Sequence, residues 1–289
     1  MSSSAAPVLT GDLITDLREL VAFPFMVNAL QAGTIVAVLA AVVGWYVVLR
    51  RQAFTSHTLS VMAFPGAAGA SLAGLPTALG YYLACAIAAL AIGRGGGPGR
   101  RAQGGETATI ATVQTVGLAA GFLFLSLNRA VLGEPDSLLF GTFLGITRSQ
   151  VLVLLAVAVA AIAALTLIAR PLLFATVDRD VAHAGGVPVG LIDTAFLLIL
   201  ALAIAATSQI TGALLVFALL VAPPASAQLI TSRPLAGLVL SVGFALAIVW
   251  LGLGLAYFSI YPVGFYVTTL AFGLYLALRA GRWIRRAAR

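Results

Sequence analysis

The sequence contains no lysine and few charged residues of any kind. All 16 basic residues among the 289 are arginine, and charged residues make up 9% of the chain, against about 25% in a typical soluble domain. A P-loop needs a lysine to hold phosphate, and a Schiff base needs a lysine amine. The chain therefore cannot hydrolyse ATP by P-loop chemistry on its own.

Metal-ligating and nucleophilic side chains are scarce as well. Cys85 is the only cysteine, and His57 and His183 are the only histidines. A single cysteine forms neither an intrachain disulfide nor a cysteine metal cluster. The sequence also has no HExxH motif, no GxSxG motif and no pair of carboxylates within an apolar segment, so we expect it not to be an enzyme.

Apolar residues dominate what is present. They make up 61% of the chain, more than a soluble globule can bury, and they form runs close to the ~20 residues that a helix needs to cross a bilayer. The runs are approximately 27–49, 55–74, 76–93, 107–127, 150–169, 188–207, 210–230, 235–258 and 263–278. We expect an all-α, polytopic transmembrane helical bundle of eight or nine spans, because two neighbouring runs could be half-spans.

The remaining segments predict the domain organisation. Residues 12–24 carry acidic and basic side chains on one side and apolar ones on the other, which is typical of an interfacial amphipathic helix. We therefore expect an N-terminal interfacial segment at 1–26, a transmembrane domain at 27–283 and a basic tail at 284–289.

The arginines predict the orientation of the bundle. They gather in three connections, at 50–54, 94–106 and 170–187, and in the tail. Arginine-rich connections of membrane proteins lie in the cytoplasm, so these segments are expected there, in a multi-pass protein of the cell inner or plasma membrane with lipid around it. The net charge of +7 is explained by this orientation and does not indicate nucleic-acid binding.

His57 and Ser60 lie three residues apart at the start of an apolar run, and therefore on one helical face. An ionisable side chain in a membrane segment is costly and is a functional candidate, so His57 is a candidate pathway residue and metal contact. A histidine that only hydrogen-bonds a neighbouring helix or lies at the headgroup level is an equal alternative. Pro65, Pro223 and Pro224 are predicted to break their helices and to free backbone carbonyls around a central pathway.

Two other polar residues lie in or beside apolar runs. Asp193 is the only acid inside such a run, and its place near the start of a predicted helix favours a structural role, either with the helix dipole or with an arginine. Gln209 lies in a polar turn predicted before the next run, where uncharged polar side chains hold helices together more often than they bind substrate.

Residues 175–189 read ATVDRDVAHAGGVPV. The segment predicts a short polar helix that ends at Gly185 and Gly186, with Pro188 beginning the next span. Such a helix between spans could be a docking surface for another protein. An ordinary connecting loop is the alternative.

Four motifs together resemble one known family, the membrane permease subunits of manganese, zinc and iron ABC importers. They are VVLRRQAF, SHTLSVMAFPG, ARPLLFATVDRDVAHAGGVPV and TGALLVFALLVAPPASAQLIT, and the resemblance extends from about residue 20 to 280. It implies a permease fold of the vitamin-B12 and metal-importer type and two copies of this chain. It also implies a cytoplasmic ABC ATPase as a separate chain, an extracellular metal-binding lipoprotein, and no cofactor besides the transported divalent ion.

The resemblance also assigns roles to particular residues. It implies that residues 175–187 form the coupling helix that contacts the ATPase, with Asp178, Arg179, Asp180, His183, Gly185 and Gly186 in it. It implies that His57 faces the pathway, at a position where the family carries aspartate. The family's histidine four residues later is replaced by Val61, which cannot bind a metal.

The sequence thus predicts the transmembrane subunit of an ATP-driven importer of divalent transition-metal ions of the Zn, Mn and Fe class. Two main alternatives remain open, besides a weaker third one, a diverged scaffold subunit that does not transport. The same fold could import a metal chelate, for which a pathway without strong ligands is expected. A secondary carrier could instead use His57 and Asp193 as proton or ion relays.

Overall fold

The computed structural model describes residues 22–95, 105–128, 145–259 and 261–287, and this part of the chain is helical without any strand. Ten helices are present in it, and nine of them have 18 residues or more. The helices are α2 (Pro24–Leu49), α3 (Ala53–Leu72), α4 (Thr77–Gly95), α6 (Gly105–Leu127), α8 (Arg148–Val177), α9 (Arg179–Ala184), α10 (Val189–Thr211), α11 (Ala213–Ile230), α12 (Pro234–Tyr257) and α13 (Val263–Ala287).

The nine long helices correspond one to one with the nine apolar runs of the sequence. Seven of them are long and apolar enough to cross a membrane. The other two are α3, in which five hydroxyl-bearing residues and His57 lower the mean hydropathy, and α11, which is shorter. The multi-pass helical bundle is confirmed, whereas the expected eight or nine spans are not confirmed.

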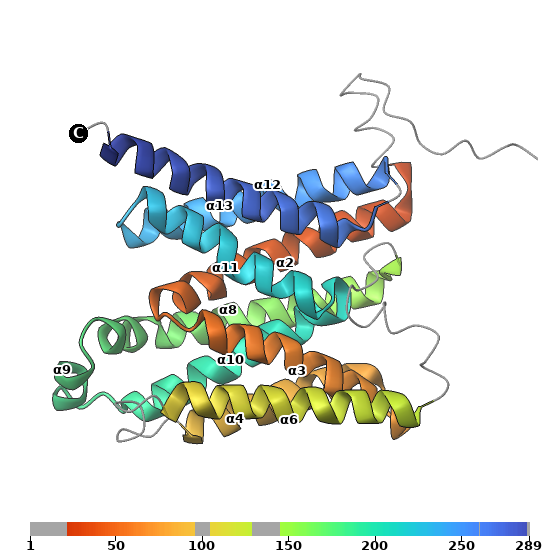
Figure 1. Cartoon of the computed structure of the whole chain (residues 1–289), viewed down its shortest axis with the longest axis horizontal. Helices are drawn as coiled ribbons and strands as arrows, with labels where there is room; N and C mark the ends of the chain where they lie inside the picture. Colours follow the sequence, from red (N-terminus) through yellow and green to blue (C-terminus); the bar gives the residue numbers. More distant parts are fainter. Residues whose placement is uncertain (1–21, 96–104, 129–144, 260, 288–289) are drawn as a thin grey trace, which may run out of the picture.

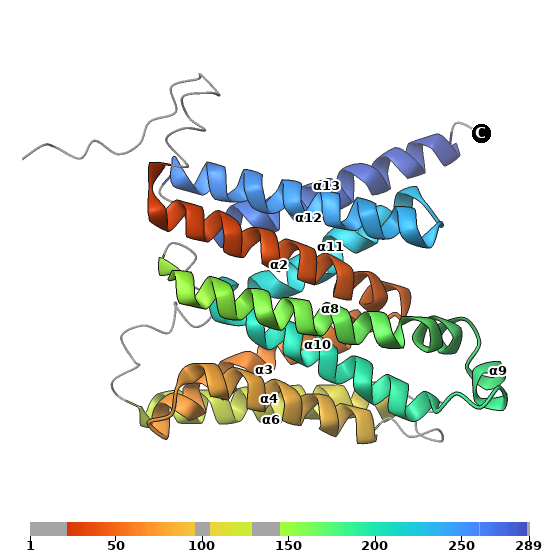
Figure 2. The ribbon, with the colours of Figure 1, turned by 180° about the vertical axis from the view of Figure 1, so that it is seen from behind.

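The helices lie side by side, and the chain reverses direction from each long helix to the next (Figures 1 and 2). Helices α3, α4 and α6 form one side of the bundle, and α12 and α13 form the opposite side. Between them lie α2, α8, α10 and α11. Helix α9 and the end of α13 lie at the same end of the bundle.

The described arginines concentrate at that end, which we call the arginine-rich end. Most of them lie in the last part of α2, α4, α8 or α13 or directly after it, or flank α9 and α12, whereas Arg148 begins α8 at the opposite end. The arginines of the arginine-rich end are Arg50, Arg51, Arg94, Arg170, Arg179, Arg233, Arg279, Arg282 and Arg285. This asymmetry agrees with the orientation that the sequence predicts.

Helices α2 and α10 form the centre of the bundle. In the apolar windows of both helices 67% of the residues are buried, against 17% in α6. A helix that is apolar all round is expected to be enclosed by other helices, and α2 has no charged residue between Pro24 and Leu49. Contacts between the ends of α2 and α10 are therefore well placed to stabilise the centre of the bundle.

The prolines do not break their helices, contrary to expectation. Helix α3 continues through Pro65 and α11 through Pro223 and Pro224. A neighbouring helix packs closely against the backbone near these prolines. A methyl group added to Gly121 of α6 would lie 3.1 Å from Cα of Pro65. One added to Gly44 of α2 would lie 2.0 Å from the Leu220 carbonyl oxygen. Pro224 has no N–H to donate to that carbonyl, so Gly44 lets α2 pack directly against it.

The predicted domain boundaries at 26 and 283 both fall within helices of the described residues. The interfacial segment at 12–24 lies almost wholly outside them, and α2 begins at Pro24. Helix α13 continues to Ala287, so the chain is helical across the boundary expected at 283.

Candidate functional site

One stripe of α3 is open on the surface of the single chain. Phe54, His57 and Val61 form this α3 stripe, at a spacing of three and four residues that places them on one helical face. Phe54 is 45% exposed, and His57 and Val61 are partly exposed, whereas Thr55 and Thr58 beside them are buried. The His57 ring meets the Phe217 ring of α11 edge-on, with 4.8 Å between centroids.

The hydroxyl groups near His57 form hydrogen bonds within α3 or to the neighbouring helix α6. Ser56 donates to the Ala53 carbonyl at 2.8 Å, and Ser60 donates to the Ser56 carbonyl at 2.9 Å. Thr58 donates across to the Gln114 side chain of α6 at 2.9 Å. Ser60 is buried, so it does not share the open stripe with His57 as the spacing predicted.

The stripe supplies a single metal-ligating side chain. Among the described residues, no three His, Cys, Asp or Glu side chains lie close enough to hold a metal ion. Pro65 is buried against α6, and since it has no N–H it cannot donate to the Val61 carbonyl one turn earlier. One chain thus offers a single imidazole on this face.

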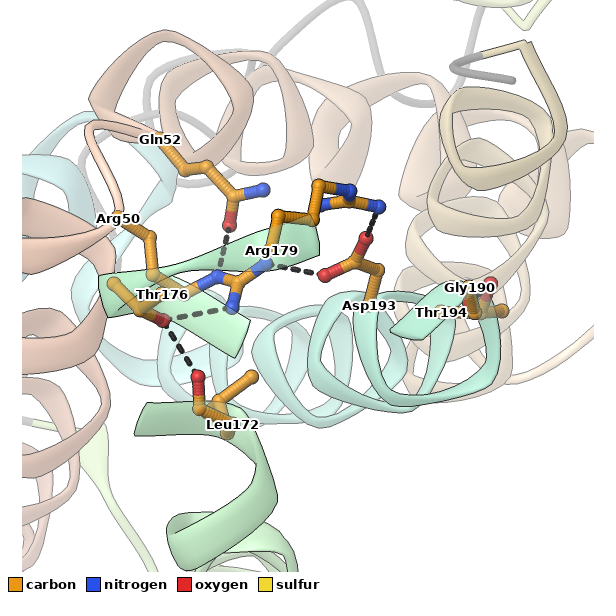
Figure 3. Close-up of polar contacts among 8 residues, drawn as sticks. All are labelled: Arg50, Gln52, Leu172, Thr176, Arg179, Gly190, Asp193 and Thr194. Atoms are coloured by element: carbon orange, nitrogen blue, oxygen red, sulfur yellow. Dashed lines mark hydrogen bonds and ion pairs between the residues drawn. The ribbon is translucent and has the colours of Figure 1, made fainter. Parts of the chain in front are cut away.

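A second cluster of polar residues surrounds Asp193 at the arginine-rich end (Figure 3). The Asp193 side chain is 3% exposed, and Nη2 of Arg50 lies 2.5 Å from its Oδ1. Arg179 donates to its other oxygen, Oδ2. Arg50 also donates to Oγ1 of Thr176 at 3.0 Å. We call Arg50, Thr176, Arg179 and Asp193 the Asp193 cluster.

The guanidinium group of Arg50 is the most enclosed cation of this cluster. Its side chain is 6% exposed, against 45% for Arg179. It lies 5.3 Å from the centre of the Phe196 ring and contacts Gln52 at 3.5 Å. A planar group with five donors can serve several acceptors at once, which suits a point where helix ends meet.

Helix α9 is the short polar helix that the sequence predicts. Oδ1 of Asp178 caps its start by accepting from the backbone N–H groups of Asp180 and Val181, both at 3.0 Å. Gly185 ends the helix, and Gly186 adopts a φ of 82° that favours glycine. His183 and Asp180 are exposed.

The other candidate residues have structural surroundings. Gln209 lies in the last turns of α10 and not in a separate turn, and it donates to the Ala205 carbonyl at 3.2 Å. Pro223 and Pro224 are buried in α11. Both oxygens of Asp193 accept from guanidinium groups, which argues against a proton relay there and agrees with the arginine partner that the sequence suggested.

The structure brings together only some of the predicted site residues. Arg179 and Asp193 meet, whereas His57 lies apart from them on α3. Sequence reasoning missed the roles of Arg50 and Thr176, because Arg50 counted only toward orientation. Its partner is 143 residues away, and no spacing rule connects such positions.

Comparisons with known proteins identify the family. The family model of the ABC 3 transport family matches residues 22–281. The manganese transport system membrane protein MntC of Halalkalibacterium halodurans is 30% identical over 215 residues, which are 74% of this chain and 73% of that protein. The chelated iron transport system membrane protein YfeC of Yersinia pestis is 31% identical over 242 residues, covering 84% and 80%.

A solved structure shows the same fold. PsaBC from Streptococcus pneumoniae, in complex with Fab, superposes with a TM-score of 0.80 over 92% of this chain and 95% of that chain, at 23% identity. These matches do not support the expected likeness to vitamin-B12 importers in particular. The chain belongs to the ABC 3 transport family, and it is a multi-pass membrane permease subunit of an ABC transporter and not an enzyme.

Proposed function

We propose that this chain forms the translocation pathway of an ATP-driven importer for divalent transition-metal ions. The observation that carries the proposal is the α3 stripe, where a histidine stands on a face that the chain leaves open. The names of two relatives support the cargo class, since one is a manganese and the other a chelated-iron transport protein.

A second copy of the chain is the natural partner for the α3 stripe. An imidazole on a membrane-facing surface is costly, and a symmetric partner would enclose His57 and bring a second imidazole to the same axis. The pathway then lies between the two copies and not within one of them. A homodimer also explains why one chain holds a single ligand.

The ATP-hydrolysing part must be a separate chain. The permease has no lysine, and α9 presents Asp180, His183 and an apolar Val181 that is 53% exposed. These side chains lie at the arginine-rich end, which is the expected cytoplasmic side. We infer that α9 contacts the ATPase and that an external binding protein delivers the ion to the other end.

The ligand set of the stripe bears on the choice of ion. Imidazole suits Zn²⁺ and Fe²⁺, whereas Mn²⁺ prefers carboxylate and carbonyl oxygens. The resemblance implies that His57 stands where the family carries aspartate and Val61 where it carries histidine, and such a change would shift the pathway away from hard ions and remove a second ligand. Weak retention in the pathway leaves selection to the binding protein.

Reconstitution tests this proposal. Proteoliposomes that contain the chain with its co-expressed ATPase and binding protein are expected to accumulate ⁶⁵Zn²⁺, ⁵⁴Mn²⁺ or ⁵⁹Fe²⁺ when ATP is supplied. Liposomes with the permease alone should accumulate none, and uptake by the permease alone would overturn the proposal. Faster uptake of a chelated ion than of the free ion would instead indicate that the transported substrate is a metal chelate.

A further inference from the structure

The Asp193 cluster joins both helices that carry α9. Thr176 lies two residues before Asp178, the residue that caps α9, and Asp193 lies in the first turns of α10 beyond it. Arg50 donates to both of them, at 3.0 Å to Thr176 and 2.5 Å to Asp193. One guanidinium group from α2 thus holds together the helix that enters α9 and the helix that leaves it (Figure 3).

Helix α9 reaches the same carboxylate by its own first residue. Arg179 donates to Oδ2 of Asp193 while Arg50 occupies Oδ1. Asp193 therefore lies directly between α9 and the end of α2. Charge-assisted contacts of this kind are short and directional and are stronger in a buried setting than at a surface.

The end of α2 continues into α3 through a tight turn. Arg51 has a φ of 58°, and the N–H of Gln52 donates to the Val47 carbonyl at 2.9 Å. Helix α3 begins at Ala53, and His57 lies in its second turn. Since only Arg51 and Gln52 separate Arg50 from α3, a displacement of Arg50 is expected to move the start of the α3 stripe.

We propose that the Asp193 cluster is the mechanical joint that carries motion of α9 to the α2–α3 turn and so to the α3 stripe. The inference rests on the proposed function, in which α9 receives the ATPase. Arg50, Asp193 and Arg179 act as positioning residues. Through these contacts, a displacement of the six-residue helix α9 is transmitted to His57 in α3.

If the Asp193 cluster only stabilised the fold and did not transmit motion from α9, the expected result would be different. A brace lowers thermal stability when it is removed but leaves the metal transported per ATP hydrolysed unchanged. A joint changes that ratio, because hydrolysis continues while α3 no longer follows α9. The two readings are separated by measuring uptake and hydrolysis in the same liposomes.

The decisive variant is Arg179→Gln in the assembled transporter. Its side chain is 45% exposed, so the loss of the contact should leave the fold intact. We expect metal transported per ATP to fall about fivefold or more, the lower range of typical coupling between sites, and Arg179→Lys to restore part of it. Arg94→Gln is the matched control, since it removes one exposed charge at the same end of the bundle and should leave the ratio unchanged.

Hydrogen exchange of the purified full-length chain tests the joint without any cargo. In Arg179→Gln the amides of residues 50–56 are expected to exchange several-fold faster, although the substitution lies in α9, because an opened joint raises local opening of the turn. Unchanged exchange there, or a wild-type ratio of metal to ATP, would overturn the joint. Failure of the wild-type complex to transport any metal would instead overturn the proposed function and leave the exchange result to decide on the joint.

Discussion

Nη2 of Arg50 lies 2.5 Å from Oδ1 of Asp193 although 143 residues separate them in the chain. Both side chains are almost completely buried at the arginine-rich end. The pair therefore joins the ends of the two most enclosed helices, α2 and α10, where a bundle gains most from a brace.

Removing the carboxylate should destabilise the protein more than removing the whole pair. Asp193→Asn takes one carboxylate away from the buried Arg50 guanidinium group, and breaking a buried pair in this way typically costs about 3–5 kcal/mol. The double variant Arg50→Gln with Asp193→Asn removes both charges of this pair and should lose clearly less. Thermal unfolding of the detergent-solubilised chain measures both, and a double variant that loses the sum of its two single variants would contradict the pairing.

Cys85 provides a native probe for such measurements. It is the only cysteine of the chain, its side chain is fully buried in α4, and its thiol donates to the Leu59 carbonyl at 3.5 Å. A fluorogenic maleimide is expected to leave the folded protein unlabelled and to label one thiol per chain after unfolding. Rapid labelling of the native protein would show that the packing of α3 on α4 is looser than described.

Glycines at helix crossings should be far less replaceable than glycines on the surface. In Gly44→Ala the new methyl group would lie 2.0 Å from the Leu220 carbonyl oxygen, which forces α2 and α11 apart. Overpacking of this kind typically costs about 1–3 kcal/mol. Gly243→Ala in α12 is the control, because nothing lies within 4 Å of the added methyl group, and it should be neutral or stabilising. Equal unfolding midpoints for the two variants would argue against the close crossing.

The sequence predicted the helices well and their ends less well. Apolar length alone locates all nine long helices, since a span needs a run of fixed length. Helix α8 nevertheless continues past Arg170 and Pro171 to Val177, because a proline removes one hydrogen bond without ending a helix that neighbours support. The breaks expected at Pro65 and Pro224 are absent for the same reason.

The candidate sites divide along similar lines. Local signals located α9, since the glycines that end it and the proline that begins the next helix act within a few residues. The spacing left the surroundings of His57 open between a pathway position and a structural one, and it did not predict the burial of Ser60. The Asp193 cluster depends on which helices become neighbours in three dimensions, and a single sequence carries no signal of that for residues 143 positions apart.

The final prediction concerns the two residues of the α3 stripe that bear on the ion. His57→Ala removes the only imidazole of the stripe and should lower ATP-driven metal uptake about tenfold, the effect of losing one contact worth about 1.4 kcal/mol. Val61→His would place a second imidazole one turn away on the same face. A pair of imidazoles binds Zn²⁺ more tightly than one, so zinc should be retained longer and its turnover should fall relative to manganese.

Val61→Ala is the matched control for this last variant, because it changes the size of the side chain without adding a ligand. Uptake of ⁶⁵Zn²⁺ and ⁵⁴Mn²⁺ by the reconstituted transporter, measured side by side, gives the selectivity directly. If His57→Ala and Val61→His both transport as the wild type does, the ion does not pass along the α3 stripe. If only Val61→His changes selectivity, the stripe faces the pathway but His57 does not contact the ion on its way.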